Sequence, residues 1–112
     1  MTVRATRLVQ GSQLTNALVT YYTSPTGTTS VVKRALFSNT TASPQTITVN
    51  VVQFGGSASA SNQVINARTV APGETYVSPE LAGVVLAAGD FIQALASAGA
   101  SITFMASGIN IT

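Results

Sequence analysis

The sequence predicts an all-β protein, a single antiparallel β-sandwich with a jelly-roll or immunoglobulin-like Greek-key topology. Short runs rich in Val, Ile, Thr and Tyr recur along the chain, separated by turns that contain Gly, Pro or Ser, a spacing typical of sandwiches. Charged residues make up 7% of the chain and apolar residues 46%, a balance that suits a β protein better than a solvated helical one. The length of 112 residues predicts one domain, residues 1–112, with one hydrophobic core.

Two strands are expected near the N-terminus. The first runs over about Val3–Val9 and is interrupted by Gly11-Ser12, and residues 1–16 are expected to form an N-terminal arm or an edge strand. The second covers residues 18–23, which are rich in Val, Thr and Tyr. It ends at Ser24-Pro25-Thr26-Gly27, where the proline and the glycine favour a β-turn.

The third strand is expected over residues 30–38, and both of its faces need cover. Its apolar residues are Val31, Ala35 and Phe37 on one parity and Val32 and Leu36 on the other. Lys33 and Arg34 are adjacent, so a regular strand sends them to opposite faces and puts at least one of them on a face meant for packing. We expect that charge either at the rim of the sheet or paired at a contact between subunits.

The middle of the chain contains the cleanest alternation of apolar and polar residues. It predicts a half-buried antiparallel strand over residues 46–51, with Ile47, Val49 and Val51 inward. The small residues of Gly55–Ser61 predict a mobile loop. Further strands are expected at 62–70, 75–77 and 91–96, with turns at 71–74, 78–81, 87–90 and 97–100.

Residues 81–95 allow two interpretations, an amphipathic helix or strands. Ala and Leu favour the helix, but Gly83 and Gly89 interrupt it, while Val84-Val85 and Phe91-Ile92 prefer strands. We therefore expect strands here.

The last strand changes parity along its length. It begins with Ile102 and Phe104 on one parity and ends with Ile109 and Ile111 on the other. A bulge at Gly108 would restore a single inward face, because one inserted residue reverses the parity of all that follow.

The composition argues against catalysis and metal binding. The chain has no His, Cys or Trp, and its acids Glu74, Glu80 and Asp90 are far apart in sequence. General acid–base catalysis needs a group that titrates near neutrality or two carboxylates in opposed environments, and hard metals need several oxygen ligands. We expect no enzyme activity, no catalytic or metal site and no cofactor.

The charge pattern does not predict nucleic-acid or membrane binding. The net charge of +2 arises from five cations, Arg4, Arg7, Lys33, Arg34 and Arg68. They are not interleaved with aromatic residues as in a surface that follows phosphates. The N-terminus has no apolar signal segment, and the Leu81–Ala88 stretch is too short to span a bilayer, so we expect a soluble protein made in a cytoplasm.

The apolar excess predicts self-association or docking to a larger assembly. A small sandwich buries only about two-thirds of its extended surface, so a chain this poor in charge exposes apolar area or covers it with copies of itself. The first strand and the strand that carries the adjacent cations are the expected contact surfaces. The candidate interface residues are Arg4, Arg7, Leu8, Tyr21, Tyr22, Lys33 and Arg34.

Several segments of the sequence resemble small β-sandwich proteins encoded among the structural genes of tailed bacteriophages. The segments are Tyr21–Arg34, Ser38–Thr41, Gln45–Val49, Ala71–Thr75, Leu86–Ile92 and Ser101–Ile109. They match in order over nearly the whole chain, from about residue 17 to the end. Related sandwiches serve as head decoration or fibre proteins, neck and collar parts, and tail-fibre or baseplate modules. The resemblance implies a virion structural protein that is assembled in the host cytoplasm, forms trimers or higher homo-oligomers, and docks to other virion proteins.

A carbohydrate-binding or host-receptor module is the alternative function. A regular strand puts one ring of Tyr21-Tyr22 on each face, so an outward ring, together with Tyr76 and loop Asn and Gln residues, could contact a glycan. Core packing with one exposed tyrosine is the simpler interpretation of the same pair.

Overall fold

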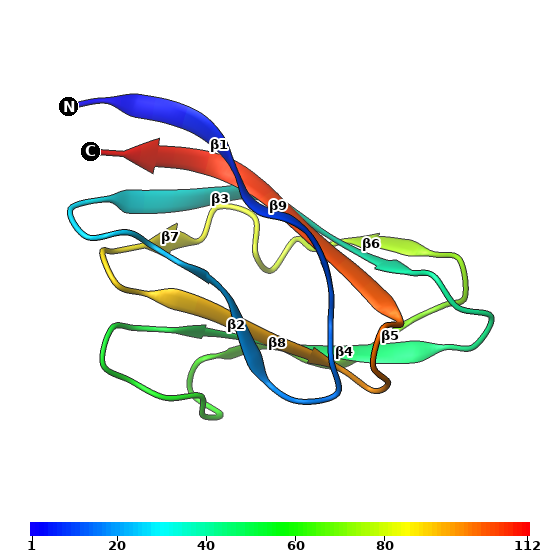
Figure 1. Cartoon of the computed structure of the whole chain (residues 1–112). Helices are drawn as coiled ribbons and strands as arrows, with labels where there is room; N and C mark the ends of the chain where they lie inside the picture. Colours follow the sequence, from blue (N-terminus) through cyan, green and yellow to red (C-terminus); the bar gives the residue numbers. More distant parts are fainter.

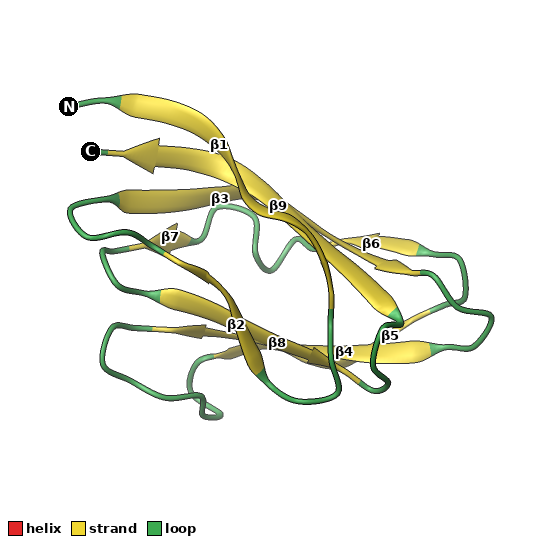
Figure 2. Ribbon diagram, viewed as in Figure 1, coloured by secondary structure: helices red, strands yellow, loops and turns green.

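A computed structural model of the chain describes residues 1–112 and consists of strands joined by turns and loops (Figure 2). The strands are β1 Val3–Gln13, β2 Val19–Thr23, β3 Thr29–Asn39, β4 Gln45–Val52, β5 Gln63–Val70, β6 Thr75–Val77, β7 Val85–Leu86, β8 Phe91–Ala96 and β9 Ile102–Ile111. The preference for strands over a helix in residues 81–95 is confirmed, since β7 and most of β8 lie there. No helix with the length and hydropathy of a membrane span is present.

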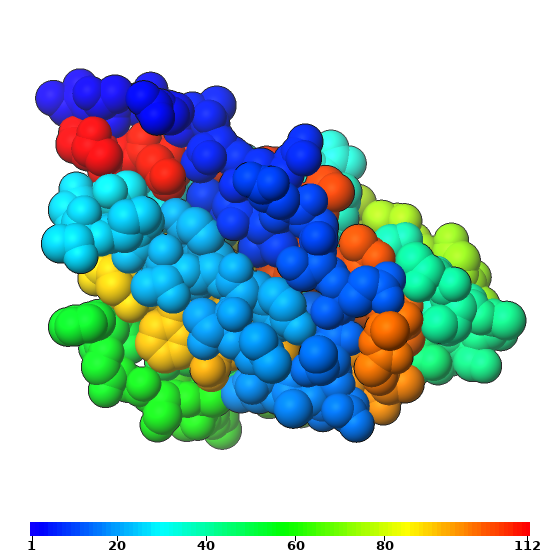
Figure 3. Space-filling model, viewed as in Figure 1, coloured from blue at the N-terminus to red at the C-terminus, as the bar shows by residue number.

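Two antiparallel sheets pack face to face as a sandwich (Figure 1). The five-stranded sheet has the order β1-β9-β3-β6, and β7 also pairs with β3. The four-stranded sheet has the order β2-β8-β4-β5. β1 lies at the edge of the five-stranded sheet, where the first residues rest against the last ones at the molecular surface (Figure 3).

The pairing of the strands is nested, and this decides the topology. β1 pairs with β9, β2 with β8, β3 with β6 and β4 with β5, so the chain is doubled like one long hairpin whose tip is the loop at 53–62. Successive pairs go to alternate sheets. This arrangement is a jelly roll, one of the two topologies that the sequence predicts.

An apolar core of 18 buried residues lies between the sheets. Phe37 and Phe104 are opposite each other on β3 and β9, and their rings stack with centroids 4.6 Å apart. Tyr21 from the other sheet meets Phe104 edge-on at 5.9 Å. Aromatic pairs in these geometries gain about 0.5–1.5 kcal/mol beyond their area burial, so this trio joins the two sheets.

A bulge in β3 decides where Lys33 and Arg34 point. Val32 is opposite Gly108 and Arg34 is opposite Ser107, so Lys33 is an extra residue in β3. Both cations are exposed on the outer face. The expectation that they point to opposite faces is wrong, because the bulge inserts a residue that a regular strand lacks.

β1 contains a similar bulge at the same level of the sheet. Arg7 is opposite Ser107 and Val9 is opposite Ala106, so Leu8 is the extra residue. β1 then continues past Gly11, whose φ of 112° accompanies a second irregularity. The expected interruption of the strand at Gly11-Ser12 is therefore wrong.

β9 has no extra residue of its own, so the prediction of a bulge at Gly108 is wrong. The extra residues lie on the two neighbouring strands instead. Ile102, Phe104 and Ala106 are buried, and the same parity continues through the buried Gly108. The half-buried Ile109 and Ile111 therefore belong to the outer face, where they pair with residues of β1 and β3.

A third bulge, in β2, corrects the expected placement of the two adjacent tyrosines. Thr20 is opposite Gln93 and Tyr22 is opposite Ile92, so Tyr21 is the extra residue. Both rings are partly buried and pack against the core. No outward ring remains at this position.

Gly108 offers a direct test of the close approach between β9 and β3. A Cβ at this position would collide with the backbone carbonyl of Val31, which cannot move without breaking the sheet. We expect Gly108→Ala to lower the free energy of unfolding by about 1–3 kcal/mol, measured by urea denaturation. Gly99→Ala is the matched control, because nothing lies within 4 Å of a Cβ there. Equal stability of the two variants would contradict the close approach.

Candidate interaction surface

Two of the three carboxylates accept hydrogen bonds from backbone amides in turns and loops. Glu74 accepts a hydrogen bond from the Ala71 amide at 2.9 Å. Asp90 accepts from the amides of Phe54 and Ala87, both at 2.9 Å. No three acids, cysteines or histidines come together as a metal cluster. The carboxylates therefore serve the backbone of the loops in which they lie.

The third carboxylate, Glu80, belongs to a small cluster at β6. It accepts hydrogen bonds from the Tyr76 hydroxyl at 2.6 Å and the Ser78 hydroxyl at 3.0 Å, and the Arg68 guanidinium lies 4.1 Å from the centre of the Tyr76 ring. Burial, then the hydrogen bond to Glu80 and its charge, raise the pKa of Tyr76, while Arg68 opposes them. Burial would raise the pKa of Glu80, but the hydrogen bonds from Tyr76, its own backbone and Ser78, with the charge of Arg68, hold that pKa below its usual value.

The outer faces of the two sheets differ in chemistry. Outward positions of the four-stranded sheet carry mainly uncharged polar side chains, such as Thr46 and Thr48 on β4 and Thr20 on β2. Gln93 of β8 donates a hydrogen bond to Thr20 across the strands at 3.1 Å. The half-buried Phe91 and Leu95 of β8 share the parity of Gln93, so this face mixes polar side chains with two apolar ones.

The outer face of the five-stranded sheet is apolar at both ends. The register places Ala5, Ile109, Val31 and Val85 in one row across four strands and Met105, Leu36 and Val77 in another. Val85 is 61% exposed and Val77 is 46% exposed, and Val3, which pairs with Ile111 next to the first row, is 54% exposed. These rows lack the polar cover of a solvated face.

A basic patch, defined here as Arg7, Lys33 and Arg34, lies between the two apolar rows. Arg7 and Arg34 are both opposite Ser107, on either side of β9, and Lys33 is the bulge residue next to them. A shallow hollow over β9 is lined by Ala5, Thr6, Arg7, Lys33, Ser107, Gly108 and Ile109. Two bulges thus gather cations from β1 and β3 around one hollow.

The predicted interface residues are divided among three places. Arg7, Lys33 and Arg34 meet in the basic patch, whereas Leu8 is 8% exposed and part of the core. The rings of Tyr21 and Tyr22 also pack inward. Ser107, Ile109, Val77 and Val85 complete the surface and were missed; the adjacent cations inside an apolar strand were the signal that could have revealed the bulge.

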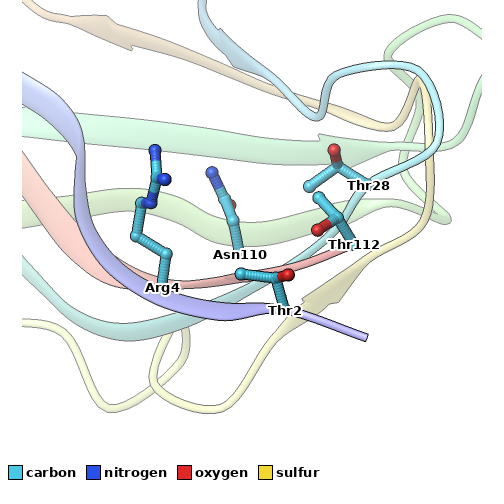
Figure 4. Close-up of a pocket in the computed structure, with 5 residues that line it drawn as sticks. All are labelled: Thr2, Arg4, Thr28, Asn110 and Thr112. Carbon is cyan, nitrogen blue, oxygen red and sulfur yellow. The ribbon is translucent and has the colours of Figure 1, made fainter.

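Arg4 points away from the basic patch and lines a polar pocket of about 280 Å³ at one end of the sandwich (Figure 4). The other lining residues are Thr2, Thr28, Asn110 and Thr112. Figure 4 shows the guanidinium of Arg4 and the amide of Asn110 side by side, projecting in the same direction.

A buried hydrogen-bond network orients the Asn110 side chain in this pocket. Its Oδ1 accepts from the hydroxyl of Ser30 at 2.8 Å and that of Tyr22 at 3.4 Å. Ser24 joins Ser30 at 3.0 Å and donates to the Thr28 carbonyl at 3.0 Å. No buried side-chain nitrogen or oxygen lacks a partner, so polar contacts replace apolar packing at this end of the core.

Comparison with known proteins supports the fold. No protein-family model matches the sequence, and no curated protein does either. A chain in the structure of infectious bursal disease virus strain Gx is similar with a TM-score of 0.51 and 15% identity, over 98% of this chain and 32% of that chain. A chain in the crystal structure of the infectious bursal disease virus VP2 subviral particle gives a TM-score of 0.49 and 14% identity, over 97% and 31%. This chain spans about a third of those viral chains, and the first similarity confirms the β-sandwich fold.

The cluster at β6 predicts a pH dependence of stability. The pKa of Glu80 is lower in the folded protein than in the unfolded chain. Its contribution to the free energy of unfolding is therefore complete above the unfolded pKa of 4.5 and is lost as the pH falls through the folded pKa. The pKa of Tyr76 is raised, so its contribution is present below 10.0 and is lost as the pH rises through the folded pKa.

The urea midpoint measured across pH 2–11 checks both the loss of stability at acid pH, the acid limb, and the loss at alkaline pH, the alkaline limb. Glu80→Gln should flatten the acid limb, and Tyr76→Phe should flatten the alkaline limb and also weaken the acid one. Midpoint profiles that match the wild-type profile in both variants would show that the cluster does not couple to folding.

Proposed function

We propose that this protein is a non-catalytic structural component of a virion, which associates with copies of itself and docks to other virion proteins. The observation that carries the proposal is the outer face of the five-stranded sheet, where exposed apolar residues flank the basic patch. The jelly-roll sandwich that presents this face is a fold also found in a chain of a virus structure.

The exposed apolar rows support assembly. Val3, Val77 and Val85 are each about half exposed or more, and they extend rows of half-buried residues on neighbouring strands. Contiguous apolar surface of this kind marks interaction sites in soluble proteins, whereas the opposite face of the sandwich is mainly polar. One face is therefore suited to contact and the other to solvent.

The sequence resemblance narrows the proposal to tailed bacteriophages. It supports a capsid decoration or head-fibre protein, or a neck- or tail-associated protein, that forms trimers or higher homo-oligomers after synthesis in the host cytoplasm. The small jelly roll suits this role because all of its carboxylates accept hydrogen bonds and no buried polar side-chain atom lacks a partner.

The glycan-binding alternative has less support in this structure. Both rings of Tyr21 and Tyr22 pack inward, and the Tyr76 ring is covered by Arg68. The polar pocket beside Arg4 has no aromatic lining. A stacking platform for a sugar is thus missing at the positions where the sequence suggested one.

Light scattering after size-exclusion chromatography tests self-association. We expect species with masses that are multiples of 11.4 kDa, trimers or larger, whose fraction rises with concentration. Replacing Val3, Val77 and Val85 together by Ser should lower the association constant of these oligomers at least tenfold. Val19→Ser is the matched control, because Val19 is 39% exposed on the other sheet.

A strict monomer at every concentration would contradict self-association. Co-sedimentation of the wild type and the valine variant with virions that lack the protein tests docking separately. Equal binding of both proteins would contradict the assignment of docking to this face.

A further inference from the structure

We infer that the basic patch binds a carboxylate-rich surface of a different protein, and not a second copy of this chain face to face. The inference rests on the proposed function, since it names the chemistry of the docking partner. It depends on three features: the convergence of the cations, the absence of a carboxylate beside them, and the apolar rows that border them.

The cations converge because both neighbours of β9 bulge at the same level. Arg7 and Arg34 are opposite the same residue, Ser107, so their backbones are about 10 Å apart across two strand spacings. Lys33 is adjacent to Arg34 and shares the hollow with Arg7. Cations placed this close on one face can meet the same acidic surface together, so their positive potentials add there.

No carboxylate of the chain neutralises this positive potential. None of Glu74, Glu80 and Asp90 lines the hollow, and each accepts hydrogen bonds from other groups. A second copy placed face to face would bring two such sets of cations together, and like charges that face each other in an interface oppose association. Another copy also offers no cluster of unengaged carboxylates. The complementary surface therefore comes from another protein.

The surroundings of the hollow indicate protein rather than nucleic acid. An arginine fork binds a carboxylate with two parallel hydrogen bonds, and the exposed Ser107 hydroxyl at the floor can donate a third. The neighbouring Ala5 and Ile109 would contact apolar side chains beside the acids. Single-stranded nucleic acid would need aromatic residues for base stacking, but no aromatic side chain lines the hollow.

Fluorescence anisotropy with labelled poly-L-glutamate tests the assignment, with a single-stranded DNA oligonucleotide of equal charge as the second probe. We expect poly-L-glutamate to bind more tightly than DNA, and its affinity to fall as salt is raised. Replacing Arg7, Lys33 and Arg34 by Gln should weaken poly-L-glutamate binding at least tenfold. Arg4→Gln is the matched control, because it removes the same charge from the same strand on the opposite face.

Four results would overturn the inference: no poly-L-glutamate binding at low salt, unchanged binding by the triple variant, an equal loss in Arg4→Gln, or tighter binding of DNA. Urea midpoints of the variants verify that they fold, and the salt dependence of the wild type tests the electrostatic claim without any substitution.

Light scattering separates this inference from the proposed function. Self-association should persist in the triple variant, because the copies do not meet through the patch; its loss would show that a second copy occupies the patch. Conversely, a monomeric wild type that still binds poly-L-glutamate would contradict self-association and leave the carboxylate site intact.

Discussion

The close approach of β3 to β9 at Gly108 is the constraint on which the surface chemistry depends. The carbonyl of Val31 occupies the space that a Cβ at this position would need, so only glycine allows the two strands to pair there. On both sides of this point the neighbouring strands contain an extra residue, Lys33 in β3 and Leu8 in β1. A bulge re-aims the side chains around it, and here two bulges turn cations outward while Val32 and Val9 stay in the core.

Along β9 the interior changes from large apolar residues to small and polar ones. Ile102 and Phe104 fill the centre of the sandwich, whereas Gly108 and Asn110 continue the same parity toward the C-terminus. At the C-terminal end of β9, where the inward side chains are no longer apolar, the hydroxyls of Ser30 and Tyr22 donate hydrogen bonds to the Asn110 side chain, and no buried polar side-chain atom lacks a partner. The strand therefore needs no bulge of its own, since the inward face ends in a hydrogen-bond network instead of a second apolar cluster.

The sequence was sufficient for the elements but not for side-chain directions around the bulges. Alternation over residues 46–51 correctly places Ile47 and Val49 in the core, and the Pro- and Gly-containing turns bound most strands within one or two residues. The parity rule failed at Tyr21 and Lys33, because it assumes a regular strand and a bulge depends on the partner strand's register. The convergence of Arg7 with Lys33 and Arg34 was equally hidden, since it depends on β1 and β3 pairing with opposite edges of β9.

A chain with so few charges makes each one informative. Its carboxylates accept hydrogen bonds in the loops and at β6, and none of them lines the hollow between the cations. Three of the five cations gather on one outer face, between rows of apolar side chains that water solvates poorly. A bulge costs regular pairing in the sheet, and two at the same level are retained here around a hollow that has no packing role. That cost is understandable if the surface they create is the one that meets a partner.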